Sequence, residues 1–142
     1  MKNIGFLSLV LIFTTSVFSK EEGITGIWQT IDDDTKQVRS FVELRVEDNR
    51  LYGKIIKLFP QQDELADPVC DKCEGDNKGK PILGMQIING LSLKKNKWKN
   101  GDILDPNNGK SYDCKIWLED GKLQVRGYIG FFYRTQEWIR PK

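Results

Sequence analysis

The sequence contains no histidine among its 142 residues. This absence excludes serine and cysteine hydrolases that use a histidine base, metal sites built on imidazole, and a histidine pH switch. The formal net charge is +2, which is too close to neutral for a dedicated nucleic-acid-binding protein. Beyond the N-terminal segment, no apolar run is long enough to span a membrane. The composition of 39% apolar and 11% aromatic residues supplies one hydrophobic core and excludes a disordered chain.

The N-terminal segment has the pattern of a secretory signal peptide. Lys2 supplies the positive charge, Ile4 to Phe13 form the apolar run, and Val17 and Ser19 are suitable for cleavage before Lys20. An uncleaved membrane anchor is the alternative, but the apolar run is short for a bilayer. No cysteine follows the cleavage position, so a lipid anchor is not supported.

We therefore predict a signal peptide over residues 1–19 and a single exported domain over residues 20–142, located in the periplasm or secreted. The mature chain would have 123 residues, 21 basic and 20 acidic, because the removed segment carries Lys2 and no acidic residue. We expect no stable membrane span after cleavage and no nucleic-acid partner.

The mature chain alternates apolar and polar residues with the period of β-strands. The clearest case runs from Tyr112 to Glu119 and is followed by Asp120-Gly121, which favours a two-residue type I′ hairpin turn. This turn sets a register in which apolar residues face each other and opposite charges meet. The predicted pairs are Glu119 with Lys122, Leu118 with Leu123, Ile116 with Val125, and Cys114 with Gly127.

Several other segments have a residue pattern that predicts strands, and no segment has the pattern of an amphipathic helix longer than two turns. Short strands between turn residues indicate an antiparallel barrel or sandwich. One long polar stretch, Phe59 to Lys80, interrupts the series; loops of this length are usually functional or stapled. The further predicted strands are Gly23–Ile31, Val42–Val46, Leu51–Leu58, Ile82–Ile88, Lys97–Ile103 and Arg134–Arg140.

The long loop contains Cys70-Asp71-Lys72-Cys73. In an oxidising compartment the favoured interpretation is a Cys70–Cys73 disulfide that closes a tight turn. A redox-active dithiol is an alternative that needs a helix N-terminus nearby. A zinc site needs four ligands, whereas the chain offers three cysteines and no histidine, so we predict no metal. The third cysteine, Cys114, is predicted to face the core, with a reactive thiol or a bond to the loop as the alternative.

Three polar segments could bind ligands or merely form turns. Asp32-Asp33-Asp34-Thr35 could hold Ca²⁺ but fits better as a solvated turn. Asp105 to Lys110 is predicted to form a rigid turn. Basic residues around Trp98 could contact nucleic acid or an anionic membrane, but a solvated strand edge is favoured. These basic residues are Lys94, Lys95, Lys97 and Lys99.

Gly26-Ile27-Trp28 is similar to the Gly-x-Trp element of lipocalins and other calycins. In those barrels the tryptophan closes one end, and an arginine of the last strand packs across its ring. The resemblance implies that Arg140, with Arg134 as the alternative, packs on Trp28.

A wider set of motifs resembles the exported bacterial family called domain of unknown function 2147, over about Gly23 to Arg140. The resemblance implies an all-β fold, a small antiparallel lipocalin-like β-barrel. That family has no established activity, so no catalytic residue and no cofactor follow from it. The motifs are Gly26-Ile27-Trp28, Asp32-Asp33, Leu51-Tyr52-Gly53-Lys54-Ile55, Cys70-x-x-Cys73, Pro81-Ile82-Leu83-Gly84, Gly101-x-Ile103-x-Asp105-Pro106, Gly109-Lys110-x-Tyr112, Arg126-Gly127-Tyr128-Ile129-Gly130 and Arg134-Thr135-Gln136-x-Trp138.

We therefore expect a non-enzymatic binding module for a small apolar ligand or a cell-envelope component, since a small barrel can hold one ligand. The alternative is that the same inward residues simply fill the core. Two other hypotheses are an interaction module that docks through the Phe59–Lys80 loop and a thiol-redox protein that uses Cys70 and Cys73. The predicted lining residues are Trp28, Tyr112, Ile116 and Trp138, together with Val42, Leu44 and Val125.

Overall fold

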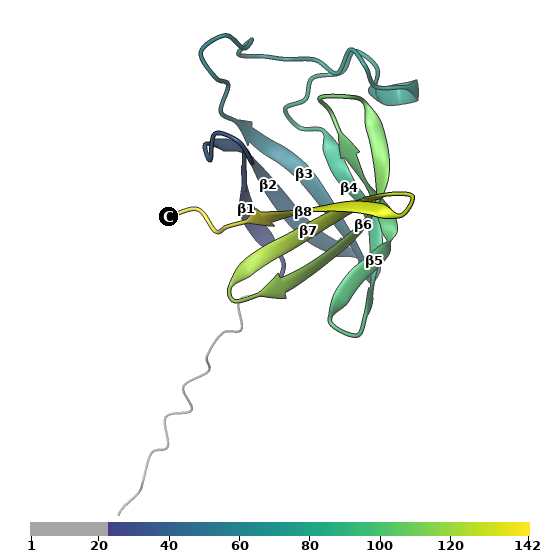
Figure 1. Cartoon of the computed structure of the whole chain (residues 1–142). Coiled ribbons are helices and arrows are strands. Elements are labelled where there is room, and N and C mark those ends of the chain that lie inside the picture. Colours follow the sequence, from purple (N-terminus) through teal and green to yellow (C-terminus); the bar gives the residue numbers. More distant parts are fainter. Residues whose placement is uncertain (1–22) are drawn as a thin grey trace, which may run out of the picture.

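The computed structural model describes residues 23–142, and the predicted signal peptide over residues 1–19 lies outside them. Eight β-strands follow one another along the chain (Figure 1). The only helix in the described part is a short 3₁₀ turn, η1, over Gly75–Asn77. The strands are β1 (Gly26–Ile31), β2 (Val38–Glu47), β3 (Arg50–Leu58), β4 (Gln86–Lys94), β5 (Lys97–Asp105), β6 (Lys110–Glu119), β7 (Lys122–Ile129) and β8 (Phe132–Trp138).

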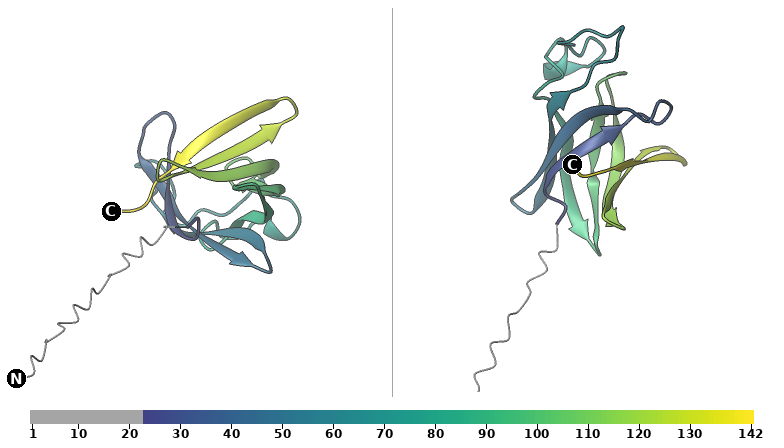
Figure 2. Two further views of the ribbon diagram at one scale, coloured as in Figure 1. Left: turned by 90° about the horizontal axis from the view of Figure 1, so that it is seen from below. Right: turned by 90° about the vertical axis from the view of Figure 1, so that its left-hand side faces the viewer.

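Each strand pairs antiparallel with the next, which gives one sheet in the order β1 to β8. The sheet curls until the end of β8 returns beside β1 (Figure 2). Gln29 and Ile139 then exchange two backbone hydrogen bonds, of 2.8 and 3.2 Å between N and O. This contact joins the two edge strands at one point and makes the sheet a nearly closed barrel. The all-β antiparallel barrel predicted from the sequence is confirmed.

The β6–β7 hairpin has the predicted register. Glu119 faces Lys122, Leu118 faces Leu123, Ile116 faces Val125, and Cys114 faces Gly127. Asp120 and Gly121 have backbone φ angles of 52° and 73°, as a type I′ turn requires. Local turn chemistry and the apolar pattern therefore agree on one pairing.

Two local predictions are wrong. The strand predicted at Ile82–Ile88 begins only at Gln86, because the backbone N–H of Met85 donates to the carbonyl of Ile82 in a turn. The basic segment around Trp98 is not a strand edge, since β4 and β5 are each paired on both sides. Its turn residues, Lys95 and Asn96, form the tip of the β4–β5 hairpin with positive φ angles.

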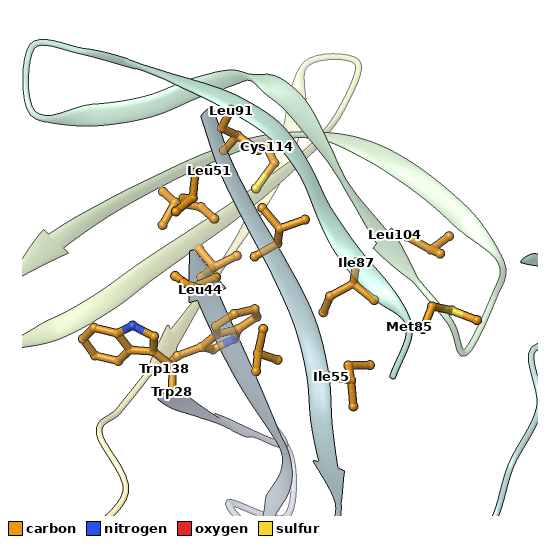
Figure 3. Packing of buried hydrophobic residues seen from close by; sticks show 14 of the residues in the cluster. Trp28, Leu44, Leu51, Ile55, Met85, Ile87, Leu91, Leu104, Cys114 and Trp138 are labelled. Carbon is orange, nitrogen blue, oxygen red and sulfur yellow. The ribbon is translucent and has the colours of Figure 1, made fainter. Parts of the chain in front are cut away.

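Apolar side chains from every strand pack into one core cluster inside the barrel (Figure 3). Trp28, Leu44, Leu51 and Ile116 are each at most 2% exposed. Cys114 is buried among them as a free cysteine, which confirms its predicted core position. Burial raises the pKa of its thiol to about 12, with a smaller contribution from the nearby Asp102 carboxylate. This thiol is therefore not a nucleophile at neutral pH.

The connection from β3 to β4, residues 59–85, rises over one end of the barrel as an ordered loop (Figure 1). A disulfide joins Cys70 and Cys73, as predicted. The backbone N–H of Cys70 donates to the carbonyl of Lys80 and the backbone N–H of Gly79 to that of Cys70, so the two limbs of the loop are tied together. The loop also packs against the β5–β6 turn, where a Cβ on Gly109 would lie 2.0 Å from the Lys72 carbonyl oxygen. The backbone at Gly109 has a φ of 72°, so the position suits glycine on two grounds.

Candidate functional site

Because consecutive strands run in opposite directions, every second connection lies at the same end of the barrel. Four connections therefore lie together at one end. They are the β1–β2 turn, the 59–85 loop, the β5–β6 turn and the β7–β8 turn. Residues from all four line a cavity of about 990 Å³ that opens to solvent. This volume lies within the range of pockets that hold small ligands. We call this end of the barrel the open end.

Part of the cavity lining is apolar. Ile55 of β3, Ile87 of β4, Ile103 of β5 and Val125 of β7 contribute aliphatic side chains, and Trp138 lies deepest toward the core. Three of them, Ile55, Ile87 and Val125, are at most 5% exposed, so this wall is held by the core packing. Such a wall can take the hydrocarbon part of a ligand out of water.

The polar part of the lining comes mainly from β1, β2 and β8. The hydroxyl groups of Thr30 and Ser40 lie 2.8 Å apart in a hydrogen bond. Asp33 accepts hydrogen bonds from Arg134 and Gln136, and the Gln136 amide oxygen accepts one from the Trp138 indole N–H. The lumen is therefore amphipathic, and these polar lining residues stand beside the apolar and aromatic ones predicted from the sequence.

These polar lining residues were not predicted from the sequence, although the sequence contains a signal for some of them. Arg134 faces Gly127 across the β7–β8 pair, Gln136 faces Val125, and Trp138 faces Leu123. Once Trp138 is placed inward, the period of two puts Gln136 and Arg134 on the same face. The contact with Asp33 spans about a hundred residues and has no local signal.

Tyr112 stands at the mouth of the cavity, on β6. Its hydroxyl oxygen accepts a hydrogen bond of 2.8 Å from the side-chain amide of Asn108. The Asn108 amide oxygen in turn accepts from the backbone N–H of Lys110, and Asp105 accepts from that of Asn107. The predicted rigid turn from Asp105 to Lys110 therefore holds the Tyr112 ring in place.

The predicted lining residues fall into two groups. Tyr112 and Trp138, with Val125, contact the cavity. Trp28 and Ile116 do not line it, and each is at most 1% exposed within the core. Val42 and Leu44 likewise belong to the core cluster. Strand alternation identifies which residues face inward, but it does not give the depth at which the interior changes from packed core to cavity.

The other end of the barrel is closed by Trp28 and Arg140. The Arg140 guanidinium carbon lies 3.9 Å from the centre of the Trp28 ring. Its terminal nitrogens donate to the carbonyl oxygens of Gly23, Thr25 and Ile27, at 2.7 to 3.1 Å. We call this the closed end of the barrel, because the stacked pair and its hydrogen bonds seal the first strand against the last.

No metal site is assembled within the described residues. Residues 23–142 bring no three potential ligands of the His, Cys, Asp or Glu type together. The Cys70 and Cys73 residues are buried, at 0% and 2% exposure, so their disulfide is shielded from exchange with solvent thiols. Within the same range, no helix has the length and apolar character needed to cross a bilayer.

Comparison with known proteins agrees with the barrel fold. The family model described as "Uncharacterized protein conserved in bacteria (DUF2147)" matches residues 26–140. No curated protein sequence matches the chain. Among solved structures the chain is similar to a protein from the human pathogen Helicobacter pylori, HP1028, which is described as belonging to the lipocalin family; the two are 19% identical over 84% of each chain, with a TM-score of 0.70. The chain thus belongs to the DUF2147 family and has the fold of a small lipocalin-like barrel.

Proposed function

We propose that the chain is a non-enzymatic binding protein that holds one small, largely apolar molecule at the open end of its barrel. The observation that carries this proposal is the cavity of about 990 Å³ that is lined by aliphatic side chains and by hydrogen-bonded polar ones. A barrel that served only as a packed scaffold would fill this space with side chains. The sequence pattern at residues 1–19 supports binding in the periplasm or outside the cell.

Gly127 provides a direct test of this proposal. It lies on the cavity wall in β7, and a Cβ there would lie at ordinary van der Waals distances, 3.7 Å from the Cβ of Tyr112 and 3.9 Å from Ile103. A Gly127→Leu substitution should therefore project into the cavity without disturbing the backbone. Gly127→Ala, which adds only one methyl group, is the matched control.

The measurement is a fluorescence titration with N-phenyl-1-naphthylamine, an uncharged apolar probe. We expect the wild type and Gly127→Ala to bind the probe and Gly127→Leu to bind it at least about tenfold more weakly, a loss of about 1.4 kcal/mol. The urea midpoint of Gly127→Leu should stay close to that of the wild type. Equal binding by all three proteins would contradict the proposal.

A second candidate function is docking on another envelope protein, and exposed apolar residues around the open end favour it. Leu65 in the long loop is 76% exposed, and Phe131 and Phe132 at the β7–β8 tip are 102% and 80% exposed. Exposed apolar clusters of this kind often mark interaction sites. This function predicts that Phe131→Ser, at an exposed residue that does not line the cavity, leaves probe binding intact but removes a crosslinked partner in the envelope.

The thiol-redox hypothesis has less support, because both cysteines are buried. It predicts reduction by millimolar glutathione, whereas a structural disulfide should resist that treatment in the folded protein. Alkylation of the glutathione-treated protein under native conditions, followed by mass measurement, separates the two expectations.

A further inference from the structure

The polar groups that line the cavity have unused hydrogen-bond donors. The Tyr112 hydroxyl accepts from Asn108, and its own hydrogen has no acceptor among residues 23–142. The Gln136 amide nitrogen makes one bond, to Asp33, and so keeps a second N–H. Thr30 and Ser40 share one hydrogen bond, which leaves one of the two hydroxyl hydrogens. A ligand that satisfies these groups must bring hydrogen-bond-accepting oxygen atoms.

The charges around the same cavity disfavour a ligand that carries a negative charge. Six carboxylates line the cavity, against three cationic side chains. Two of the cations are already paired with acids, Arg39 with Glu64 and Arg134 with Asp33. A hydrogen bond from the backbone N–H of Thr35 lowers the pKa of Asp32, which keeps this rim carboxylate ionised near neutral pH. An incoming carboxylate would therefore lose hydration and meet a net negative rim.

A cationic head group is disfavoured by the donors inside the cavity and not by the charge of the rim. The rim attracts it, but a cation has no lone pair to accept the unused hydrogens of Tyr112, Gln136 and the Thr30–Ser40 pair. These donors would lose their water and stay without a hydrogen-bond partner, which is costly. An uncharged head group avoids both penalties and can still accept the hydrogen bonds of Tyr112 and Gln136.

Building on the proposed function, we infer that the ligand is an uncharged amphiphile whose head group is rich in ester or hydroxyl oxygen atoms. Its hydrocarbon chain lies along Ile55, Ile103 and Val125 toward Trp138, and its head group lies at Tyr112 and Gln136 near the mouth. The acidic rim and the donor-rich lumen together select against fatty-acid carboxylates and against cationic amphiphiles.

The test uses three amphiphiles with the same twelve-carbon chain, each below its micelle-forming concentration. The uncharged one is 1-dodecanoylglycerol, the anionic one is dodecanoate, and the cationic one is dodecyltrimethylammonium. Each is titrated against wild-type protein loaded with N-phenyl-1-naphthylamine at pH 7.5. We expect 1-dodecanoylglycerol to displace the probe at a concentration about tenfold lower than either charged compound, the factor that corresponds to about 1.4 kcal/mol.

A pair of charge variants separates rim charge from other causes. Asp34→Lys with Asp71→Lys changes two exposed residues that line the mouth. It should improve dodecanoate displacement several-fold and leave 1-dodecanoylglycerol unchanged. Glu47→Lys with Glu119→Lys makes the same change in net charge at exposed positions of the closed end and should alter neither.

The remaining outcomes would contradict either the head-group inference alone or the proposed function as well. If dodecanoate or dodecyltrimethylammonium displaces the probe best from the wild type, or if none of the three displaces it, the head-group inference is wrong while cavity binding stands. If the probe itself does not bind, the proposed function fails and this inference fails with it.

Discussion

The two ends of this barrel are built from the same eight strands but in opposite ways. At the closed end, Trp28 is 1% exposed, and Arg140 covers its ring while donating to three backbone carbonyls. At the open end, aliphatic residues share the interior with Thr30, Ser40 and Gln136, and a loop held by a disulfide stands over the mouth. The comparison indicates that the closed end stabilises the fold and that the open end is available for binding. Substitutions at the closed end should mainly lower stability, and substitutions at the open end should mainly weaken binding.

The largest expected effect on stability is at the closed end. Trp28→Ala removes a fully buried indole and the surface on which Arg140 stacks, and it should lower the free energy of unfolding by about 3 to 5 kcal/mol. Trp117→Ala is the control, because Trp117 is a half-buried tryptophan on β6 that stacks with Lys97 and Arg126. The control should lose about 1 kcal/mol. Urea denaturation measures both, and similar losses would contradict a special role for Trp28.

A smaller effect is expected where the long loop meets the barrel. Gly109→Ala would bring a Cβ to 2.0 Å from the Lys72 carbonyl oxygen, so the loop must move away. We expect a loss of about 2 to 3 kcal/mol and faster proteolysis within residues 59–85. Gly130→Ala is the matched control, since its φ of 57° is also positive but no atom lies within 4 Å of the added Cβ. If the two variants lose equally, the close contact at Lys72 is not what holds the loop.

Removal of the disulfide should have a modest effect on the stability of the fold and a clear effect on probe binding at the mouth of the cavity. Cys70 and Cys73 are separated by three positions, so their bond closes a short loop and should contribute about 2 kcal/mol. We expect Cys70→Ser with Cys73→Ser to remain folded but to bind N-phenyl-1-naphthylamine more weakly, because residues of this loop line the cavity. Thermal denaturation and probe titration measure the two effects. Unchanged binding would mean that the loop does not shape the site.

The smallest expected effect is a pH dependence at the β1–β2 turn. Backbone N–H groups of Thr35 and Asp34 donate to the Asp32 carboxylate and lower its pKa below the usual value of 3.8. Because the folded-state pKa is the lower one, the stabilisation is complete above the unfolded-state value and is lost as the pH falls through the folded-state value. Asp32→Asn should therefore flatten the dependence of unfolding free energy on pH between about pH 5 and 2. Identical slopes for Asp32→Asn and wild type would refute this account of the turn.

Much of the fold could be predicted because its determinants are local. The alternation from Tyr112 to Glu119 and the Asp120-Gly121 turn specify the β6–β7 register without reference to the rest of the chain. The start of β4 could not be read in this way, because Ile82 is drawn into a turn by its hydrogen bond to the carbonyl of Pro68 in the long loop. Apolar residues at a strand-like spacing do not reveal such a distant competitor.

The site was harder to predict than the fold, for a physical reason. Period-two alternation places Trp28, Ile116, Tyr112 and Trp138 inside the barrel, yet only Tyr112 and Trp138 reach the cavity. The depth of the cavity depends on how residues from many strands pack together. The contact of Asp33 with Gln136 depends in the same way on closure of the whole barrel.

The most direct test of the account is a native mass spectrum of the wild-type protein recovered from its own cell envelope, compared with Gly127→Leu. Denaturing spectra of both proteins give the mass after cleavage before Lys20 and the loss of two hydrogens for one disulfide. We expect extra mass of a small molecule in the native wild-type spectrum that is absent from the denatured one and from Gly127→Leu. Bare protein in both native spectra, together with no binding of the apolar probe, would contradict the claim that the open end is a ligand site.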